Sequence, residues 1–218
     1  MIQQIATYFS EHLGDWLGMV ADHLAISGMA LCAGLLIAVP LGIACSRHTW
    51  SERLATGAAG VLRVIPSLAV LILCVPYLGV GTLPAVVALT VLAIPPMLIN
   101  TAVALRGVSP EIIEAATAMG MSPLRLWLTV KAPLAFPLAF PLAFSGVRTA
   151  ASEVIASATL AAYIGAGGLG ILIYTGLGAL RSDLLWIGGV SVALLSLTVN
   201  RALALVERRL RAYEHANG

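Results

Sequence analysis

Charged residues are scarce in this sequence of 218 residues. Asp, Glu, Lys and Arg together make up 10% of it, whereas 60% of its residues are apolar. Soluble proteins contain roughly 25% charged residues, so this composition excludes an ordinary soluble domain. Because a membrane-spanning helix needs about 20 residues, the chain has room for about five or six spans. We therefore expect an all-α, polytopic membrane helix bundle with about five transmembrane helices.

Catalytic and metal-binding patterns are also missing. Cys32, Cys45 and Cys74 lie in apolar runs at no metal-ligand spacing, so we interpret them as small buried hydrophobic residues. The four histidines are scattered, and no phosphate-binding loop, paired carboxylates or nucleophile with a base occurs. The chain is therefore predicted not to be an enzyme, to bind no metal and to hold no cofactor of its own.

Lysine and arginine are absent from residues 1–22, which distinguishes this segment from a signal peptide with its basic start. Apolar residues recur there at helical spacing, from Ile2 to Val20, with polar residues between them. This pattern predicts an extracellular amphipathic helix that lies along the membrane surface. A tail packed on the bundle is the alternative.

Five apolar segments follow, and together they predict a transmembrane domain over residues 23–206. They lie at residues 23–46, 54–78, 83–105, 141–162 and 182–206. Pro95 and Pro96 are expected to interrupt the third span. The fourth is expected to begin near Pro141, because prolines at 133, 137 and 141 each remove a helical hydrogen bond. Residues 171–180 are expected to form a re-entrant or interfacial helix, and residues 207–218 a basic tail.

A polar segment at residues 109–133 separates the third and fourth spans. Ser109, Pro110 and Glu111 have the order of a helix start: a capping serine, a proline at the first position and an acid in the first turn. Gly120 ends this short helix, and the pair Ser122-Pro123 begins a second one. We predict two short helices that meet at a glycine and face water.

The same segment resembles the EAA motif, E-A-A-x3-G-x9-I-x-L-P, of permease subunits in ABC importers. Glu114-Ala115-Ala116, Gly120 and Pro133 match its spacing, while Val130 and Ala132 replace isoleucine and leucine. In that family the motif is the cytoplasmic coupling helix, which docks on an ATPase subunit. An amphipathic loop with no dedicated partner is the alternative. The resemblance implies ATPase coupling by Glu111, Glu114, Ala115, Ala116, Gly120, Met121, Ser122, Pro123 and Arg125.

Further segments are similar to the branch of this family that imports glycine betaine, choline and carnitine. They are Ile65 to Leu68, Gly146 to Ala150, Ala158 to Ala162, and Ile164 to Gly170. The resemblance implies a type I importer fold, like that of methionine importer permeases, in the bacterial inner membrane. It implies a second permease subunit (a homodimer or a paralogue), a cytoplasmic ATPase dimer that binds ATP-Mg, and an extracytoplasmic binding protein. Lipid is the remaining partner, and no nucleic acid is expected.

Two other functions stay open at this point. A methionine-type importer permease shares the architecture, and an ATP-independent channel or carrier shares the composition. Gly165, Gly167 and Gly170 formally match a nucleotide-binding pattern, but no strand or downstream acid surrounds them. We interpret this stretch as a turn where the backbone approaches another surface closely.

Glu153 is the one carboxylate near the middle of a predicted span, and such residues are functional candidates. It has two possible roles: attraction of a cationic substrate, or a structural bond to Asn100 or to an arginine. Arg148 is five residues away, about 140° around the helix, so the two do not pair along one face. The predicted substrate pathway comprises Pro66, Ser67, Asn100, Glu153, and Tyr77 and Tyr163 as cation–π surfaces.

The distribution of arginine predicts the orientation, because cytoplasmic loops carry an excess of basic residues. With five spans, the face opposite to the EAA-like segment has Arg181 alone. The face of that segment has Arg47, Arg53, Arg106, Arg125, Lys131, Arg208, Arg209 and Arg211. We therefore expect the EAA-like segment and the C-terminus in the cytoplasm and the N-terminus outside.

Overall fold

The computed structural model describes the backbone of residues 2–46, 49–105 and 110–216, and their side chains except at 2, 49, 52, 110, 131–142 and 210–216. All regular elements in these ranges are helical, which confirms the predicted fold class. They are α1 (Ile2–Cys45), α2 (Thr49–Leu62), α3 (Ser67–Leu78), α4 (Thr82–Ala104), α5 (Pro110–Ala118), α6 (Pro123–Leu126), the π-helical η1 (Trp127–Lys131), α7 (Ala132–Ala158), the 3₁₀-helical η2 (Thr159–Ile164), α8 (Gly170–Gly178) and α9 (Ser182–Ala216).

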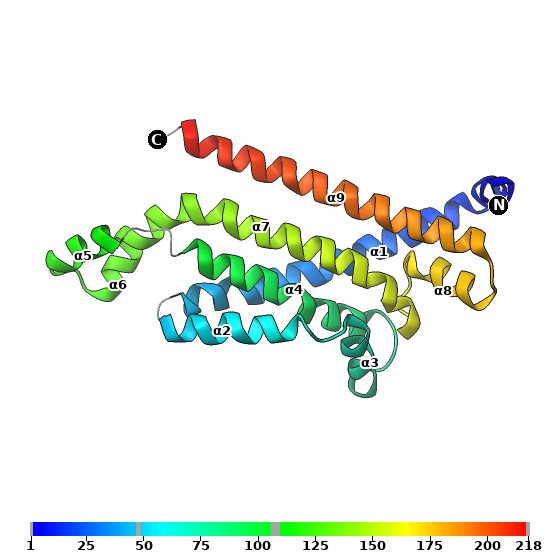
Figure 1. The fold of residues 1–218 in the computed structure, drawn as a ribbon, viewed down its shortest axis with the longest axis horizontal. Helices are drawn as coiled ribbons and strands as arrows, with labels where there is room; N and C mark the ends of the chain where they lie inside the picture. Colours follow the sequence, from blue (N-terminus) through cyan, green and yellow to red (C-terminus); the bar gives the residue numbers. More distant parts are fainter. Residues whose placement is uncertain (1, 47–48, 106–109, 217–218) are drawn as a thin grey trace.

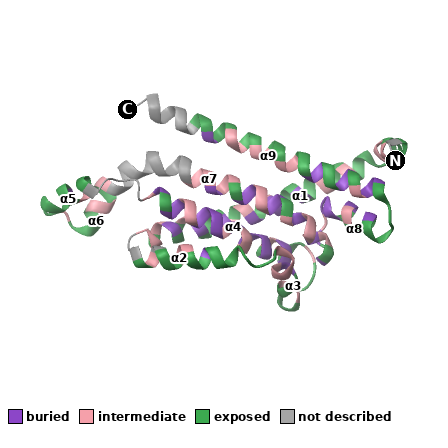
Figure 2. Ribbon diagram, in the orientation of Figure 1, coloured by how far each residue is buried: buried purple, intermediate pink, exposed green. Residues whose placement is uncertain are grey.

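The long helices α1, α4, α7 and α9 extend along the long axis of the molecule (Figure 1). Helix α4 packs on both α1 and α7, and α9 packs on the other side of α7. Within the described residues, α1, α4 and α9 are long and apolar enough to cross a membrane, and α2 with α3 forms a bent pair that would make a fourth span. The buried residues concentrate along α4 and the neighbouring faces of α1 and α7 (Figure 2).

Helix α1 differs from the prediction because it has no boundary between residues 22 and 23. Its one irregular residue is His12, with φ −124° and ψ 22°. The helix continues through His23, whose side chain is fully buried, with Nε2 2.9 Å from the Ile155 carbonyl oxygen of α7. Trp16 packs against α9 and donates a hydrogen bond from Nε1 to Ser191 Oγ at 2.9 Å. These contacts agree with the alternative of a segment packed on the bundle, and a position along the membrane surface stays a prediction.

The predicted second span, residues 54–78, is divided into α2 and α3, which are bent by 89° relative to each other. Pro66 causes the break. It has no N–H to donate into the preceding turn, and its ring disfavours a helical conformation at Ile65. Its own backbone is extended, with φ −58° and ψ 130°, and α3 starts at Ser67.

The prolines that were predicted to interrupt the third span and to delay the fourth do not break their helices. Helix α4 continues through the buried Pro95 and Pro96, and α7 runs from Ala132 to Ala158 through all three prolines of the Pro-Leu-Ala-Phe repeat. Prolines four residues apart remove hydrogen bonds from one row along the helix and leave the other rows intact. The fourth predicted span therefore begins well before Pro141. Helix α9 likewise continues beyond residue 206, to Ala216.

The cysteines were predicted to be buried, and this is wrong. Cys32 is exposed, and Cys45 and Cys74 are partly exposed. Cys32 lies on a face of α1 that the described part of this chain leaves open, whereas Cys74 is at the edge of the hydrophobic core. In a membrane protein such apolar faces can contact lipid, so an apolar run in the sequence does not distinguish the core from the lipid-facing surface.

Gly146 controls the contact between α7 and α4, and replacing it tests the packing. A Cβ there would lie 2.8 Å from the Pro96 carbonyl oxygen and 2.8 Å from Asn100 Cβ. We expect Gly146→Ala to destabilise the fold by about 1–3 kcal/mol, because the added methyl group overpacks a rigid contact. Gly189→Ala in α9 is the control, since its Cβ would meet nothing within 4 Å. Thermal unfolding of the two purified variants in detergent checks this, and equal midpoints would contradict it.

Candidate functional site

The EAA-like segment forms a small unit at one end of the molecule, where α5 and α6 project beyond the long helices (Figure 1). The two helices meet at Gly120, whose φ is +77°, a conformation that glycine adopts without strain. Ser122 caps α6, since its Oγ accepts a hydrogen bond from the Arg125 N–H at 3.4 Å. Two short helices that meet at a glycine are therefore confirmed, while Ser109 lies outside the described residues.

The surface of this unit combines charges with large apolar side chains. Glu111, Glu114 and Arg125 are exposed, as are Ala115, Pro123 and Ser122, whereas Ala116 is buried and Met121 is half-buried. Large exposed apolar side chains among charges are typical of a contact site for another protein. The exposed apolar residues are Ile112, Met119, Leu124 and Leu128.

Basic residues gather at the same end of the molecule as α5 and α6. Arg53 lies near the start of α2, and Arg208 and Arg209 lie in the last turns of α9. These helix ends lie at the same end of the bundle as α5 and α6, whereas the junction between α8 and α9 is at the other end (Figure 1). Arg181 belongs to that junction, directly before Ser182. Arg47 and Arg106 lie outside the described residues. The fold thus places Arg53, Arg125, Arg208 and Arg209 toward one end of the bundle, while the side of the membrane on which that end lies stays a prediction.

Glu153 forms an ion pair with Arg63, which lies in the bend between α2 and α3. The side chains of Arg63 and Glu153 are 43% and 37% exposed, so both are accessible in this chain. The partner of Glu153 is therefore an arginine, one of the two structural alternatives that were predicted. Asn100, the other alternative, bonds to its own helix instead. Its Nδ2 donates to the Pro96 carbonyl oxygen of the same helix at 2.8 Å.

The other predicted pathway residues occupy two places. Pro66 and Ser67 follow Arg63 at the bend and start α3, on which Tyr77 is 88% exposed. Tyr163 contacts Tyr174 of α8 edge to face, with ring centroids 5.0 Å apart. The Pro66-Ser67 bend is therefore linked to Glu153 by the Arg63–Glu153 ion pair. Tyr163 contacts Tyr174, which the sequence analysis did not assign to the pathway.

The glycine-rich loop makes the close approach that was predicted. Gly165, Gly167 and Gly168 all have positive φ. A Cβ on Gly168 would lie 3.1 Å from His23 Nδ1, and a Cβ on Gly170 would lie 2.0 Å from the Thr159 carbonyl oxygen. An open groove of about 840 Å³ lies at this end, with Glu11, Asp15 and Arg181 among its lining residues.

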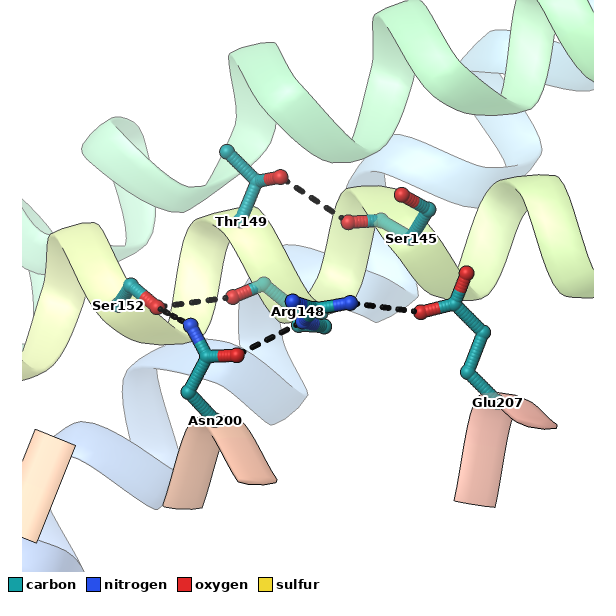
Figure 3. A network of polar contacts seen from close by, with 6 residues as sticks. All are labelled: Ser145, Arg148, Thr149, Ser152, Asn200 and Glu207. Atoms are coloured by element: carbon teal, nitrogen blue, oxygen red, sulfur yellow. Dashed lines mark hydrogen bonds and ion pairs between the residues drawn. The ribbon is translucent and has the colours of Figure 1, made fainter. Parts of the chain in front are cut away.

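A polar network between α7 and α9 was missed by the sequence analysis (Figure 3). Arg148 donates from Nε to Asn200 Oδ1 at 2.7 Å and from an Nη to Glu207 Oε2 at 3.2 Å. Asn200 Nδ2 donates in turn to Ser152 Oγ at 2.8 Å. The available signal was a pair of polar residues, Arg148 and Asn200, inside predicted spans. Glu207 was assigned to the tail, although its side chain is only 9% exposed.

Comparison with known proteins gives consistent matches over most of the chain. The family model for the binding-protein-dependent transport system inner membrane component matches residues 31–212. The carnitine transport permease protein OpuCB of Listeria monocytogenes is 42% identical over 94% of this chain and 93% of its own length. The choline transport system permease protein OpuBB of Bacillus subtilis is 35% identical over 96% of this chain and 94% of its own.

Solved structures share the fold. The MetNI methionine ABC transporter in an inward-facing conformation matches with a TM-score of 0.73 and 22% identity, over 89% of this chain and 95% of that chain. A crystal structure of an amino acid ABC transporter with histidines matches with a TM-score of 0.71 and 18% identity, over 92% and 96%. These similarities confirm the predicted fold of a type I ABC importer permease.

The network around Arg148 predicts a stability effect. Arg148→Leu removes a cation from the buried Glu207 and a donor from Asn200, so we expect a loss of about 1–3 kcal/mol of unfolding free energy. Adding Glu207→Leu should recover part of that loss, because the carboxylate no longer has to be buried. Thr149→Val is the matched control, since Thr149 points away from α9 (Figure 3). Thermal unfolding in detergent measures the effect, and an unchanged midpoint for Arg148→Leu would refute it.

Proposed function

Because this chain belongs to the family of binding-protein-dependent transport system inner membrane components, we propose that it is the permease of an ATP-driven importer for a small osmoprotectant such as glycine betaine, carnitine or choline. The observation that carries this proposal is the 42% identity to a carnitine transport permease over 94% of the chain. The chain itself is a transport subunit and not an enzyme, so ATP-Mg binds to partner ATPase subunits.

The methionine-type alternative has weaker support. The methionine importer shares the fold at 22% identity, whereas relatives with carnitine or choline in their names share 42% and 35%. Fold is retained over larger sequence divergence than the residues that select a substrate. We therefore assign the osmoprotectant class and infer that an extracytoplasmic binding protein delivers the substrate.

Coupling to the ATPase is assigned to the unit formed by α5 and α6. It projects from the bundle, and it exposes both charges and large apolar side chains, of which Met119 is 70% exposed. These features suit a surface that docks into a cleft on another protein. The contact residues that we propose are the nine predicted from the motif, with Ala116 as a buried support for the exposed helix face.

The sidedness follows from the arginine distribution. We infer that the end with α5, α6, Arg53, Arg208 and Arg209 faces the cytoplasm, because short loops rich in basic residues stay on that side. The N-terminus, α8 and the glycine-rich loop then face outward, where the groove of about 840 Å³ offers a docking place for the binding protein. A second permease subunit, identical or paralogous, completes the pathway.

Transport by the reconstituted complex tests the proposed function. Proteoliposomes containing this chain, its ATPase subunit and its binding protein should take up radiolabelled glycine betaine, carnitine or choline about tenfold faster with ATP than without it. Methionine is the comparison substrate and should not be accumulated. Uptake that does not depend on ATP would indicate a carrier or channel, and uptake of methionine alone would indicate the alternative importer.

The shape and charge of the coupling unit give a further prediction. Gly120→Val should strain the turn by about 1–2 kcal/mol, because a β-branched residue is disfavoured at φ +77°. Gly120→Asn is the matched control, since asparagine tolerates this conformation. Glu114→Lys reverses a charge on the exposed face of α5. We expect Gly120→Val and Glu114→Lys to reduce the ATPase that co-purifies with the permease, and Gly120→Asn to retain it. Full retention by all three variants would contradict the coupling role.

A further inference from the structure

Two exposed helix faces of the bundle differ sharply in character. The exposed face of α9 carries five large apolar residues and one charge, Arg201 near its proposed cytoplasmic end; the apolar residues are Trp186, Val190, Leu194, Leu197 and Leu205. The open face of α7 carries Ser145, Thr149, Glu153 and Ala156, of which Thr149 and Ala156 are exposed and the other two half-buried. Residues at this spacing lie on one side of a helix. We call these four residues the α7 stripe.

The α7 stripe does not suit contact with lipid. A carboxylate and hydroxyl groups are costly in hydrocarbon, and such residues face a water-filled cavity or another polar surface. The apolar face of α9 has the composition expected at lipid, so the two helices divide these roles. The α7 stripe therefore faces the interior of the assembled transporter.

The ion pair that Glu153 of this stripe forms with Arg63 is accessible, because both side chains are partly exposed. Their exposed fractions of 43% and 37% leave room for a third group to approach. Among the described residues, neither side chain has another hydrogen bond. Arg148 on the opposite side of α7 is different, because both Asn200 and Glu207 hold it in place. The Arg63–Glu153 pair can therefore open when a ligand replaces both partners.

We propose, on the basis of the proposed function, that this ion pair is a charge-exchange site for zwitterionic substrates. A quaternary ammonium group takes the place of the Arg63 guanidinium beside Glu153, and the substrate carboxylate accepts hydrogen bonds from Arg63. A betaine leaves no charge unpaired when the ion pair opens. Choline has no carboxylate to accept hydrogen bonds from Arg63 in place of Glu153, so the site favours zwitterions over a simple cation.

The proposal predicts uncoupling in the reconstituted complex. Glu153→Gln and Arg63→Gln should lower glycine betaine uptake per ATP hydrolysed by about tenfold, while the loaded binding protein still stimulates ATP hydrolysis. Arg148→Gln is the matched control on the other side of α7, and its uptake and hydrolysis should fall in proportion. If uptake and hydrolysis also change together in Glu153→Gln and Arg63→Gln, or neither changes, the pair is structural and the proposal is wrong.

A second measurement needs no transport and separates this proposal from the proposed function. Ala156→Cys is introduced into a chain whose three native cysteines are replaced by serine, and its rates with a cationic and an anionic methanethiosulfonate are compared. In this background, Arg63→Gln should favour the cationic reagent and Glu153→Gln the anionic one, with the two rate ratios differing by about tenfold. Leu194→Cys on α9 should stay unlabelled.

Each labelling outcome decides the point. Equal rate ratios in the two variants, or no labelling of Ala156→Cys, would overturn the proposal even if ATP-dependent uptake is observed. Conversely, a wild-type complex without ATP-dependent uptake would remove the proposed function, while opposite rate ratios would still establish the pair as a water-accessible charge site.

Discussion

The close approach of α4 to its two neighbours is the constraint on which the rest of the structure depends. This approach requires glycine at the contacts. A Cβ on Gly34 of α1 would lie 2.8 Å from Ala93 Cβ, and a Cβ on Gly146 of α7 would lie 2.8 Å from the Pro96 carbonyl oxygen. Because helices in lipid gain little from hydrophobic burial, such close packing provides much of their association. The position of α7 on α4 in turn sets which of its faces meets α9 and which remains open.

Polar residues inside the bundle follow from that arrangement. Arg148 faces α9, where Asn200 and Glu207 satisfy it, while Glu153 faces the bend of α2 and α3, where Arg63 pairs with it. The first group fixes two helices to each other. The second lies on an open surface, and its partner comes from a segment that Pro66 turns out of the helix. One helix thereby carries a structural charge network on one side and an accessible ion pair on the other.

Much of this could be predicted from the sequence, and the errors have physical causes. The coupling unit was predictable because Gly120 and Ser122-Pro123 act locally, through backbone conformation and capping. Pro66 ends a helix, whereas α7 continues through prolines spaced four residues apart, which remove hydrogen bonds from one row and leave the other rows intact. The partner of Glu153 could not be identified, because Arg63 is 90 positions away and a bend brings them together.

The proposed coupling requires α5 and α6 to lie on the cytoplasmic side of the membrane, because an ATPase can reach them only from there. Met119→Cys, in a chain without its native cysteines, places a thiol on the exposed surface of this unit. A membrane-impermeant maleimide should label it in inside-out vesicles and leave it unlabelled in intact cells. Labelling in intact cells would contradict the account.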